Sequence, residues 1–171
     1  IASIWIAPEQ ASLLQILLKL RGDRDVVEVG TLAGYSAISM ARAVGPQGRV
    51  KTLERNPEHV AFARQWIAKS DVAGRVEVLE GDARDVLRRL PSASADACFI
   101  DADKDWYTNY AKAVLPRLRV GGCLTAHNVM EASGRRGGGM TGDFYPFIRG
   151  LPDFETTLDS RGGGMSISFK R

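Results

Sequence analysis

The chain has 171 residues, of which 44% are hydrophobic, and this length suits one sizeable core, so we expect a single globular domain over residues 1–171. The formal net charge of +3 is mild and spread along the chain, which permits an anionic ligand or RNA without requiring either. No apolar run approaches the roughly 20 residues that a membrane-spanning helix needs, so no membrane partner is expected.

The first predicted element is a helix over residues 7–20, "APEQASLLQILLKL". Pro8 suits the first turn of a helix, and Gly22 stands just past the end, where helices commonly stop. Apolar side chains at helical spacing are expected to form one buried face. They are Leu13, Ile16, Leu17 and Leu20.

Further along the chain, apolar runs of strand length alternate with segments of helical period. The expected strands cover residues 25–30, 49–54, 75–80, 95–101 and 121–129. Helices are expected over residues 35–44 and 83–90 and after the cap pair Asn56-Pro57. That third helix would bury Val60, Ala63 and Ile67. A further helical stripe consists of Tyr107, Tyr110, Ala111, Val114, Leu115 and Leu118.

This alternation predicts an α/β fold. Strands that alternate with helices need crossover connections, which favour a parallel sheet covered on both faces. After Val129 the regularity breaks, and the glycines of "EASGRRGGGMTGD" predict a loop over residues 131–143. The tail segments 154–160 and 164–170 are predicted to form a closing antiparallel pair of strands. We find no internal repeat and no linker.

A glycine pair marks the turn after the first expected strand, in "VVEVGTLAGYS". Gly30 and Gly34 lack a Cβ, so the backbone can turn tightly and a ligand can approach it closely. Glu54 closes the second strand 20 residues after Gly34, where a carboxylate can accept hydrogen bonds from a ribose diol. We therefore expect an adenosine-containing ligand at this edge of the sheet. On their own, the two glycines would equally serve strand-to-helix packing.

The same loop argues against a dinucleotide. The dinucleotide fingerprint G-x-G-x-x-G presses a pyrophosphate onto a helix N-terminus, whereas this segment reads Gly30-Thr31-Leu32-Ala33-Gly34. Glu28 precedes the first glycine by two residues. A carboxylate there would repel a pyrophosphate but suits a cationic ligand, or orders the loop that holds one. S-adenosylmethionine carries a sulfonium and an ammonium and no phosphate, so it fits better than NAD.

Five motifs, in order and spacing, resemble the S-adenosylmethionine-dependent O-methyltransferases of the catechol and caffeoyl-CoA type. They are "VVEVGTLAGYSAISMA", "TLERNPEHVAFARQWI", "VEVLEGDARDVL", "DACFIDADKDWYTNY" and "VLPRLRVGGCLTAHNV", between about Pro8 and Val129. The resemblance implies a class I methyltransferase fold, which is Rossmann-like: a seven-stranded, mostly parallel sheet with helices on both faces and an antiparallel last strand. It also implies a homodimer. We expect the family's N-terminal helices, which shape the acceptor pocket and the dimer contact, to be lacking here.

The resemblance further implies roles for single residues. It implies that Glu28, Gly30, Gly34 and Ser36 surround the methionine end of the cofactor. It also implies that Glu54 lies at the ribose, and that Asp82 and Ala83 lie at the adenine. In "DADK" the family has a metal ligand, which is Asp101 here, and a lysine general base, which is Lys104 here. Asp101 is also expected beside the cofactor.

Simple chemistry supports these two roles. Methyl transfer from a sulfonium to oxygen is an in-line displacement, and a phenol with a pKa of about 10 is mostly protonated at neutral pH. A divalent cation that holds both catechol oxygens would lower that pKa, while a nearby base removes the proton. Asp101 closes the fourth expected strand, where ligands bind, and Lys104 follows three residues later.

One position departs from the family pattern. The strand that presents two metal ligands usually ends in Asp-Asn, but here it ends in His127-Asn128. Imidazole in place of a carboxylate removes one negative charge and one hard oxygen, both of which magnesium favours. Four roles for His127 are open. It could ligate a softer ion such as manganese, iron or zinc, or act as a second acid/base beside Lys104 without a metal. Alternatively, it marks lost catalysis or has no role beyond a hydrogen bond. We favour a weakened or altered metal site of Asp101, His127 and Asn128.

The expected acceptor is a small phenolic or catechol-like molecule. One alternative is RNA with a hydroxylated base, because Arg135-Arg136 could attract its backbone. The other is a protein that binds S-adenosylmethionine without catalysis, for which His127 is the argument. The first residues do not resemble a signal peptide, and Cys98 and Cys123 lie in apolar runs without C-x-x-C spacing, so a cytoplasmic location is expected.

Overall fold

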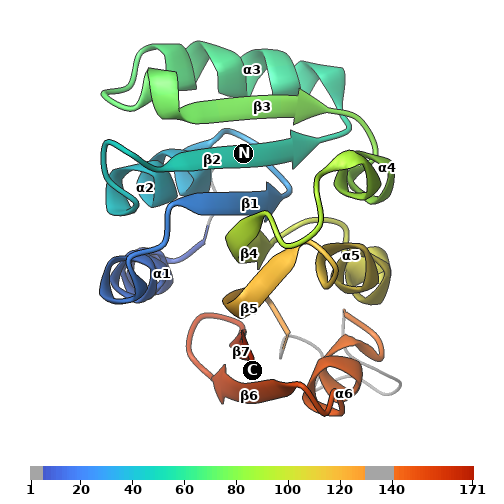
Figure 1. The fold of residues 1–171 in the computed structure, drawn as a ribbon. Helices are drawn as coiled ribbons and strands as arrows, with labels where there is room; N and C mark the ends of the chain where they lie inside the picture. The colour runs from blue at the N-terminus through green and yellow to red at the C-terminus, as the bar shows by residue number, and fades with distance from the viewer. Residues whose placement is uncertain (1–5, 130–140) are drawn as a thin grey trace.

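A computed structural model describes residues 6–129 and 141–171 and contains one seven-stranded sheet (Figure 1). The strands lie in the order β3-β2-β1-β4-β5-β7-β6. Their bounds are β1 Asp25–Val29, β2 Arg49–Glu54, β3 Val76–Glu80, β4 Ala95–Ile100, β5 Leu118–His127, β6 Phe154–Asp159 and β7 Met165–Lys170. The helices are α1 Pro8–Arg21, α2 Tyr35–Ala43, α3 Pro57–Ala68, α4 Ala83–Arg89, α5 Tyr107–Val114 and α6 Phe144–Arg149, with short 3₁₀ helices at Ala73–Arg75 and Lys104–Trp106.

The pairing of the strands confirms the predicted fold class. β1 pairs in parallel with both β2 and β4, β2 pairs in parallel with β3, and β4 pairs in parallel with β5. The last strand, β7, is antiparallel to both β5 and β6. The chain builds outward from β1 to β3 and then returns to place β4 on the other side of β1. The strand order therefore switches between β1 and β4.

Helices cover both faces of this sheet (Figure 1). On one face, α1 and α2 enclose a core that includes Leu14 and Met40. On the other face, α4, α5 and α6 enclose a core that includes Leu87 and Tyr107. The third helix, α3, packs along β3 and β2. Its three side chains that were expected to be buried are buried: Val60, Ala63 and Ile67.

The predicted buried face of α1 was wrong. The expected stripe was Leu13, Ile16, Leu17 and Leu20. Leu20 is 82% exposed and Ile16 is 52% exposed, whereas Leu14 and Leu18 are 4% and 2% exposed. The helix carries two adjacent apolar stripes, so its periodicity alone does not tell which one faces inward. Packing of α1 against α2 selects the stripe that contains Leu14 and Leu18.

Two further boundaries differ from the expectation. The fifth helix ends at Val114, and Leu118, expected in its stripe, is instead the first residue of β5. Pro116 explains this end, because proline lacks the N–H that a continuing helix needs. Helix α6 was not predicted, since its six residues contain Pro146 and are too few to show a helical period.

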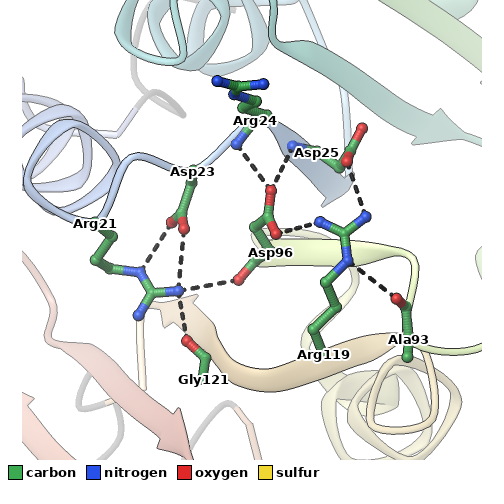
Figure 2. Close-up of polar contacts among 8 residues, drawn as sticks. All are labelled: Arg21, Asp23, Arg24, Asp25, Ala93, Asp96, Arg119 and Gly121. Carbon is green, nitrogen blue, oxygen red and sulfur yellow. Dashed lines mark hydrogen bonds and ion pairs between the residues drawn. The ribbon is translucent and has the colours of Figure 1, made fainter.

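An ion-pair network ties together the amino ends of β1, β4 and β5 (Figure 2). Asp96 near the start of β4 accepts hydrogen bonds from the backbone N–H groups of Arg24 and Asp25, both at 2.9 Å. Its other carboxylate oxygen contacts Arg119, whose guanidinium also lies 3.0 Å from Asp25 Oδ2. Arg21 at the end of α1 adds hydrogen bonds to Asp23, Asp96 and Gly121. This network fixes the strand ends opposite to those where ligands bind.

Two expectations about the whole chain concern membranes and cysteines. Within residues 6–129 and 141–171, no helix is long and apolar enough to cross a membrane. Cys98 and Cys123 are buried free thiols, as predicted for small core residues. Burial raises the pKa of both thiols, so neither is a reactive thiolate at neutral pH.

Candidate active site

A cavity of about 370 Å³ lies at the carboxyl ends of β1, β2 and β4, beside the switch in strand order. Open α/β sheets bind ligands at this place. Seven of the eleven predicted site residues line the cavity: Gly30, Ser36, Glu54, Asp82, Ala83, Asp101 and Lys104. The other four are not among its lining residues: Glu28, Gly34, His127 and Asn128.

Gly30 follows β1 and packs against the end of β4. Its backbone has a φ of +99°, which glycine adopts readily. The strand ends are joined by hydrogen bonds from Gly30 N–H to the Leu53 carbonyl and from Asp101 N–H to the Val29 carbonyl, both 2.9 Å. A Cβ on Gly30 would lie only 2.2 Å from the Asp101 carbonyl oxygen. Protein packing therefore requires glycine here, in addition to the approach of a ligand that the sequence suggested.

Gly34 ends the loop as the N-cap of α2 and is not among the lining residues of the cavity. Its N–H donates to the Thr31 carbonyl at 2.8 Å, and its φ of +82° opens α2. A Cβ at this position would lie 3.2 Å from two side-chain carbons of Ile67 in α3. Close packing of the start of α2 on α3 therefore requires glycine here, and the predicted place of Gly34 beside the cofactor stays a prediction.

Glu28 lies fully buried beneath the loop. Its carboxyl group accepts hydrogen bonds from the hydroxyls of Ser36 and Thr52, and Thr52 Oγ1 lies 2.6 Å from Thr31 Oγ1. Burial raises the pKa of Glu28 to about 8, so the buried group is largely protonated at pH 7. Of the two roles expected for Glu28, the geometry matches ordering of the loop.

Glu54 presents a rigidly held carboxylate to the cavity. Its Oε2 accepts from the backbone N–H of Leu32 at 3.1 Å, and its Oε1 accepts from those of Arg55 and Asn56, each at 3.0 Å. A carboxylate has about four acceptor positions, so three backbone bonds orient the group and leave acceptor capacity. This arrangement suits the predicted hydrogen bonding to a diol.

Asp82 forms the next part of the wall and caps α4. Its carboxylate accepts from the backbone N–H of Arg84 and from the Arg84 guanidinium, both at 2.9 Å. Hydrogen bonding from Arg84 lowers the pKa of Asp82 to about 2, so the group is an ionised acceptor. Arg84 also stacks 4.1 Å above the ring of Trp106, which is not a lining residue of the cavity.

Asp101 and Lys104 meet at the end of β4. Lys104 Nζ lies 2.7 Å from Asp101 Oδ1 and donates to Tyr107 Oη at 2.7 Å. The Tyr107 hydroxyl in turn donates to the His127 carbonyl at 3.0 Å. Burial raises the pKa of Tyr107 well above its ordinary value, so this hydroxyl keeps its proton. The amine is thus held at the cavity wall by two fixed partners, and Tyr107 is fully buried, as predicted.

His127 ends β5 and bonds at both ring nitrogens. Its Nδ1 lies 3.1 Å from Asp101 Oδ2, and its Nε2 lies 3.1 Å from the Gly162 carbonyl oxygen. Burial acts to raise the pKa of Asp101, but the hydrogen bond from His127 and the charge of Lys104 lower it overall, so Asp101 is ionised. Asn128 follows with a φ of +58°, and its buried Oδ1 has no hydrogen-bond partner in the described parts of the chain.

The three residues expected to hold a divalent cation lie together, but their contacts do not fit one. Both carboxylate oxygens of Asp101 and both ring nitrogens of His127 already have partners. Only Asn128 Oδ1 is left, and magnesium and calcium sites are built from carboxylates and several oxygens. The described residues contain no group of three or more His, Cys, Asp or Glu side chains that could hold a metal ion. The predicted metal site stays a prediction.

The cavity also has lining residues that the sequence pattern did not indicate. They include Thr31, Leu32, Tyr35, Asn56, His59 and Tyr110. Asn56 stands two residues after β2 and His59 lies in the first turn of α3, so their place near a strand end was an available signal. Tyr110 sat in an apolar helical stripe, which gave no sign that it reaches a ligand site. Arg135 and Arg136 lie outside the described residues.

Comparison with known proteins places the chain among methyltransferases. A family model described as O-methyltransferase matches residues 1–134. The chain is 40% identical over 132 residues to a catechol O-methyltransferase of Niastella koreensis, covering 75% of this chain and 60% of the relative. It is also 40% identical over 131 residues to a catechol O-methyltransferase of Mycobacterium tuberculosis, covering 77% and 60%. These matches span about 60% of the length of either relative.

Solved structures show the same fold. Cofactor-bound Rv0187 from MTB matches with a TM-score of 0.92 and 32% identity, over 99% of this chain and 83% of that chain. The O-methyltransferase from Bacillus cereus in complex with SAH matches with a TM-score of 0.90 and 30% identity, over 99% and 84%. Strand order, sequence and structural likeness agree, and the chain belongs to the O-methyltransferase family.

Proposed function

We propose that this chain transfers a methyl group from S-adenosylmethionine to a hydroxyl of a small phenolic or catechol-like acceptor. The observation that carries the proposal is the position of Lys104, whose Nζ lies at the cavity wall 2.7 Å from Asp101 Oδ1. An amine beside a fixed carboxylate can take a proton from a hydroxyl and be stabilised as the ammonium ion. The names of the relatives, catechol O-methyltransferase, support the class of acceptor.

The cavity fits the cofactor by its chemistry. Glu54 offers a fixed carboxylate to the ribose diol, and Asp82 offers an ionised carboxylate to an exocyclic amine of the adenine. The loop that begins at Gly30 and the first turn of α2, which contains Ser36, would hold the methionine end, with Glu28 ordering them through its bond to Ser36. A volume of about 370 Å³ lies in the range of roughly 300–1,000 Å³ of small-ligand sites.

In the proposed step, the Lys104 ammonium that is paired with Asp101 first releases a proton to solvent, and the resulting amine then takes the proton of the acceptor hydroxyl. The ammonium that results is paired with Asp101. The oxygen lone pair forms the new bond to the methyl carbon. S-adenosylmethionine, when bound, supplies that methyl group, and the electron pair of the broken carbon–sulfur bond stays on sulfur.

The proposed step uses none of the other partners expected from the sequence. The divalent cation at Asp101, His127 and Asn128 is left out, because the hydrogen bonds of these residues do not fit it. An RNA acceptor rests on Arg135 and Arg136, outside the described residues, so a small molecule is the proposed partner. The homodimer and the cytoplasmic location stay predictions.

Mass spectrometry of the chain incubated with S-adenosylmethionine and a panel of catechols and monophenols tests the proposal. We expect methylated product and S-adenosylhomocysteine in equal amounts. Lys104→Met should abolish turnover, and Lys104→Arg, which keeps the charge beside Asp101 but cannot act as a base, should be similarly inactive. Calorimetric binding of S-adenosylhomocysteine should persist in both. Cofactor binding without turnover of any acceptor would favour the non-catalytic alternative.

A further inference from the structure

We infer that His127 and the turn between β6 and β7, residues 160–164, close the position that a divalent cation would need, and that this chain transfers methyl groups without such a cation. The kinetic part of the inference rests on the proposed function. The binding part rests only on the hydrogen bonds around His127. It decides against the metal-ligand alternative that the sequence left open for this residue.

In this arrangement both ring nitrogens of His127 face oxygen atoms that only accept hydrogen bonds. The Gly162 carbonyl oxygen can only accept, so Nε2, at 3.1 Å, carries a hydrogen. The Asp101 carboxylate also only accepts, so the 3.1 Å contact with Nδ1 is attractive when that nitrogen carries a hydrogen as well. Histidine binds metals through a nitrogen without hydrogen. Coordination would therefore break one of these two bonds.

The turn that presents the Gly162 carbonyl is itself held by two elements. Gln10 of α1, which is 1% exposed, donates to the Arg161 carbonyl at 2.7 Å. The N–H of Val129, just after β5, donates to the Gly164 carbonyl at 3.2 Å. A Cβ on Gly162 would lie 2.8 Å from Gln10 Oε1, so the turn packs closely on α1. Turning the imidazole toward a metal would leave a fixed carbonyl without its partner.

The charges at this place are already balanced by side chains. Asp101 faces the Lys104 amine at Oδ1 and the His127 ring at Oδ2. An aspartate at position 127 would add a second carboxylate beside the first, and two close carboxylates are stabilised by a cation between them. Histidine removes this second negative charge. The chain thus supplies from its own residues the donors that Asp101 needs.

Asn128 is the remaining candidate ligand. Its Oδ1 is buried and has no hydrogen-bond partner among the residues that the structure describes. A neutral amide oxygen can accept a hydrogen bond from a water or an acceptor hydroxyl. One such oxygen, beside an Asp101 carboxylate that is already engaged at both oxygens, does not supply the ligand set of a divalent cation.

Calorimetric titration of Mn²⁺ into the protein loaded with S-adenosylhomocysteine tests the binding part without turnover. We expect no saturable binding to the unmodified chain. His127→Asp restores a carboxylate and should bind Mn²⁺ saturably. Its Kd should be at least about tenfold lower than the weakest Kd that the titration can detect. Leu20→Asp is the control, because it adds a carboxylate at a position that is 82% exposed and lies outside the cavity. It should create no Mn²⁺ site.

Turnover of the best acceptor with and without EDTA tests the kinetic part. The unmodified chain should keep its rate within about twofold in EDTA. His127→Asp should lose turnover in EDTA and regain it with added Mg²⁺ or Mn²⁺, since its two carboxylates then need a cation.

Saturable Mn²⁺ binding to the unmodified chain, or loss of its turnover in EDTA, would overturn the inference. If His127→Asp does not fold, these two measurements on the unmodified chain still decide. A failure to methylate any acceptor would count against the proposed function, while the Mn²⁺ titration would still give its own answer.

Discussion

The carbonyl oxygen of Asp101 occupies the space that a side chain on Gly30 would need, since a Cβ there would lie 2.2 Å away. Gly30→Ala should therefore destabilise the fold. Overpacking costs about 1–3 kcal/mol, and a left-handed φ adds about 1–2 kcal/mol for a residue with a Cβ. Urea unfolding followed by circular dichroism measures the total, which we expect to be about 2–5 kcal/mol.

Gly45→Ala provides the matched control for this prediction. Gly45 also has a positive φ, +74°, but a Cβ there would meet no atom within 4 Å. Only the backbone strain of about 1–2 kcal/mol should appear. Equal losses in the two variants would mean that the contact with Asp101 is not what requires glycine at position 30.

Glu54→Ala should weaken cofactor binding. The variant loses a carboxylate that three backbone N–H groups orient at the cavity. Charge-assisted hydrogen bonds to a diol are worth roughly 1.5–3 kcal/mol, which is the loss expected for S-adenosylhomocysteine by calorimetry. Glu80→Ala is the control, because Glu80 is the register partner of Glu54 on β3 but is exposed and does not line the cavity. An unchanged affinity in Glu54→Ala would place the ribose elsewhere.

Tyr107→Phe should slow the chemical step more than it weakens cofactor binding. The variant removes the hydroxyl that accepts from Lys104 and donates to the His127 carbonyl. An unpaired buried carbonyl costs about 1–3 kcal/mol in the free energy of unfolding. A less well oriented Lys104 should lower kcat by about tenfold or more, with the KM for S-adenosylmethionine unchanged. A purely structural hydroxyl would leave kcat unchanged once the folded fraction is accounted for.

The part of the site that the sequence predicts well consists of residues at the carboxyl ends of strands or within two residues of them. Parallel strands with helical crossovers bring their carboxyl ends to one edge, so a position just after a strand fixes a place in space. Gly30, Glu54, Asp82 and Asp101 all meet at the cavity for this reason. The alternation of strand and helix patterns predicts the order of these elements equally well.

The part that sequence could not predict depends on partners distant in the chain. His127 turns toward the Gly162 carbonyl, 35 positions later, because the β6–β7 turn is packed there. Glu28 turns inward because Thr52 on the neighbouring strand bonds to it. Local pattern carries no information on such pairings. The two apolar stripes of α1 show the same limit, since only its packing against α2 distinguishes them.

Glu28→Gln should flatten the pH dependence of stability. Burial raises the pKa of Glu28 from 4.5 to about 8 in the folded state, so the folded protein holds a proton that the unfolded chain releases. The contribution of Glu28 to stability is fully present below pH 4.5, and it is lost as the pH rises to about 8. A neutral amide avoids that loss, so the variant should be relatively more stable at pH 8–9 than at pH 5.

Thermal unfolding of both proteins from pH 4 to pH 9 measures this difference. The exposed Glu58→Gln serves as control and should follow the unmodified protein at every pH. The difference in stability between Glu28→Gln and the unmodified protein could instead be the same at pH 5 and pH 8. That result would show that the buried carboxyl is already ionised in the folded state.

Asp96→Asn should remove stability at neutral pH and little of it in acid. Burial acts to raise the pKa of Asp96, but the N–H groups of Asp25 and Arg24 and the guanidinium of Arg119 lower it overall. A carboxyl whose folded pKa is depressed stabilises the fold above its unfolded pKa of about 3.9, and the stabilisation is lost as the pH falls through the folded pKa. We expect a loss of about 1–2 kcal/mol at pH 7 that shrinks below about pH 4, measured by urea unfolding. Asp71→Asn breaks the exposed ion pair with Arg42 and should change stability little. If both variants lose the same amount at pH 7, the network at the amino ends of the strands is no stronger than a surface pair.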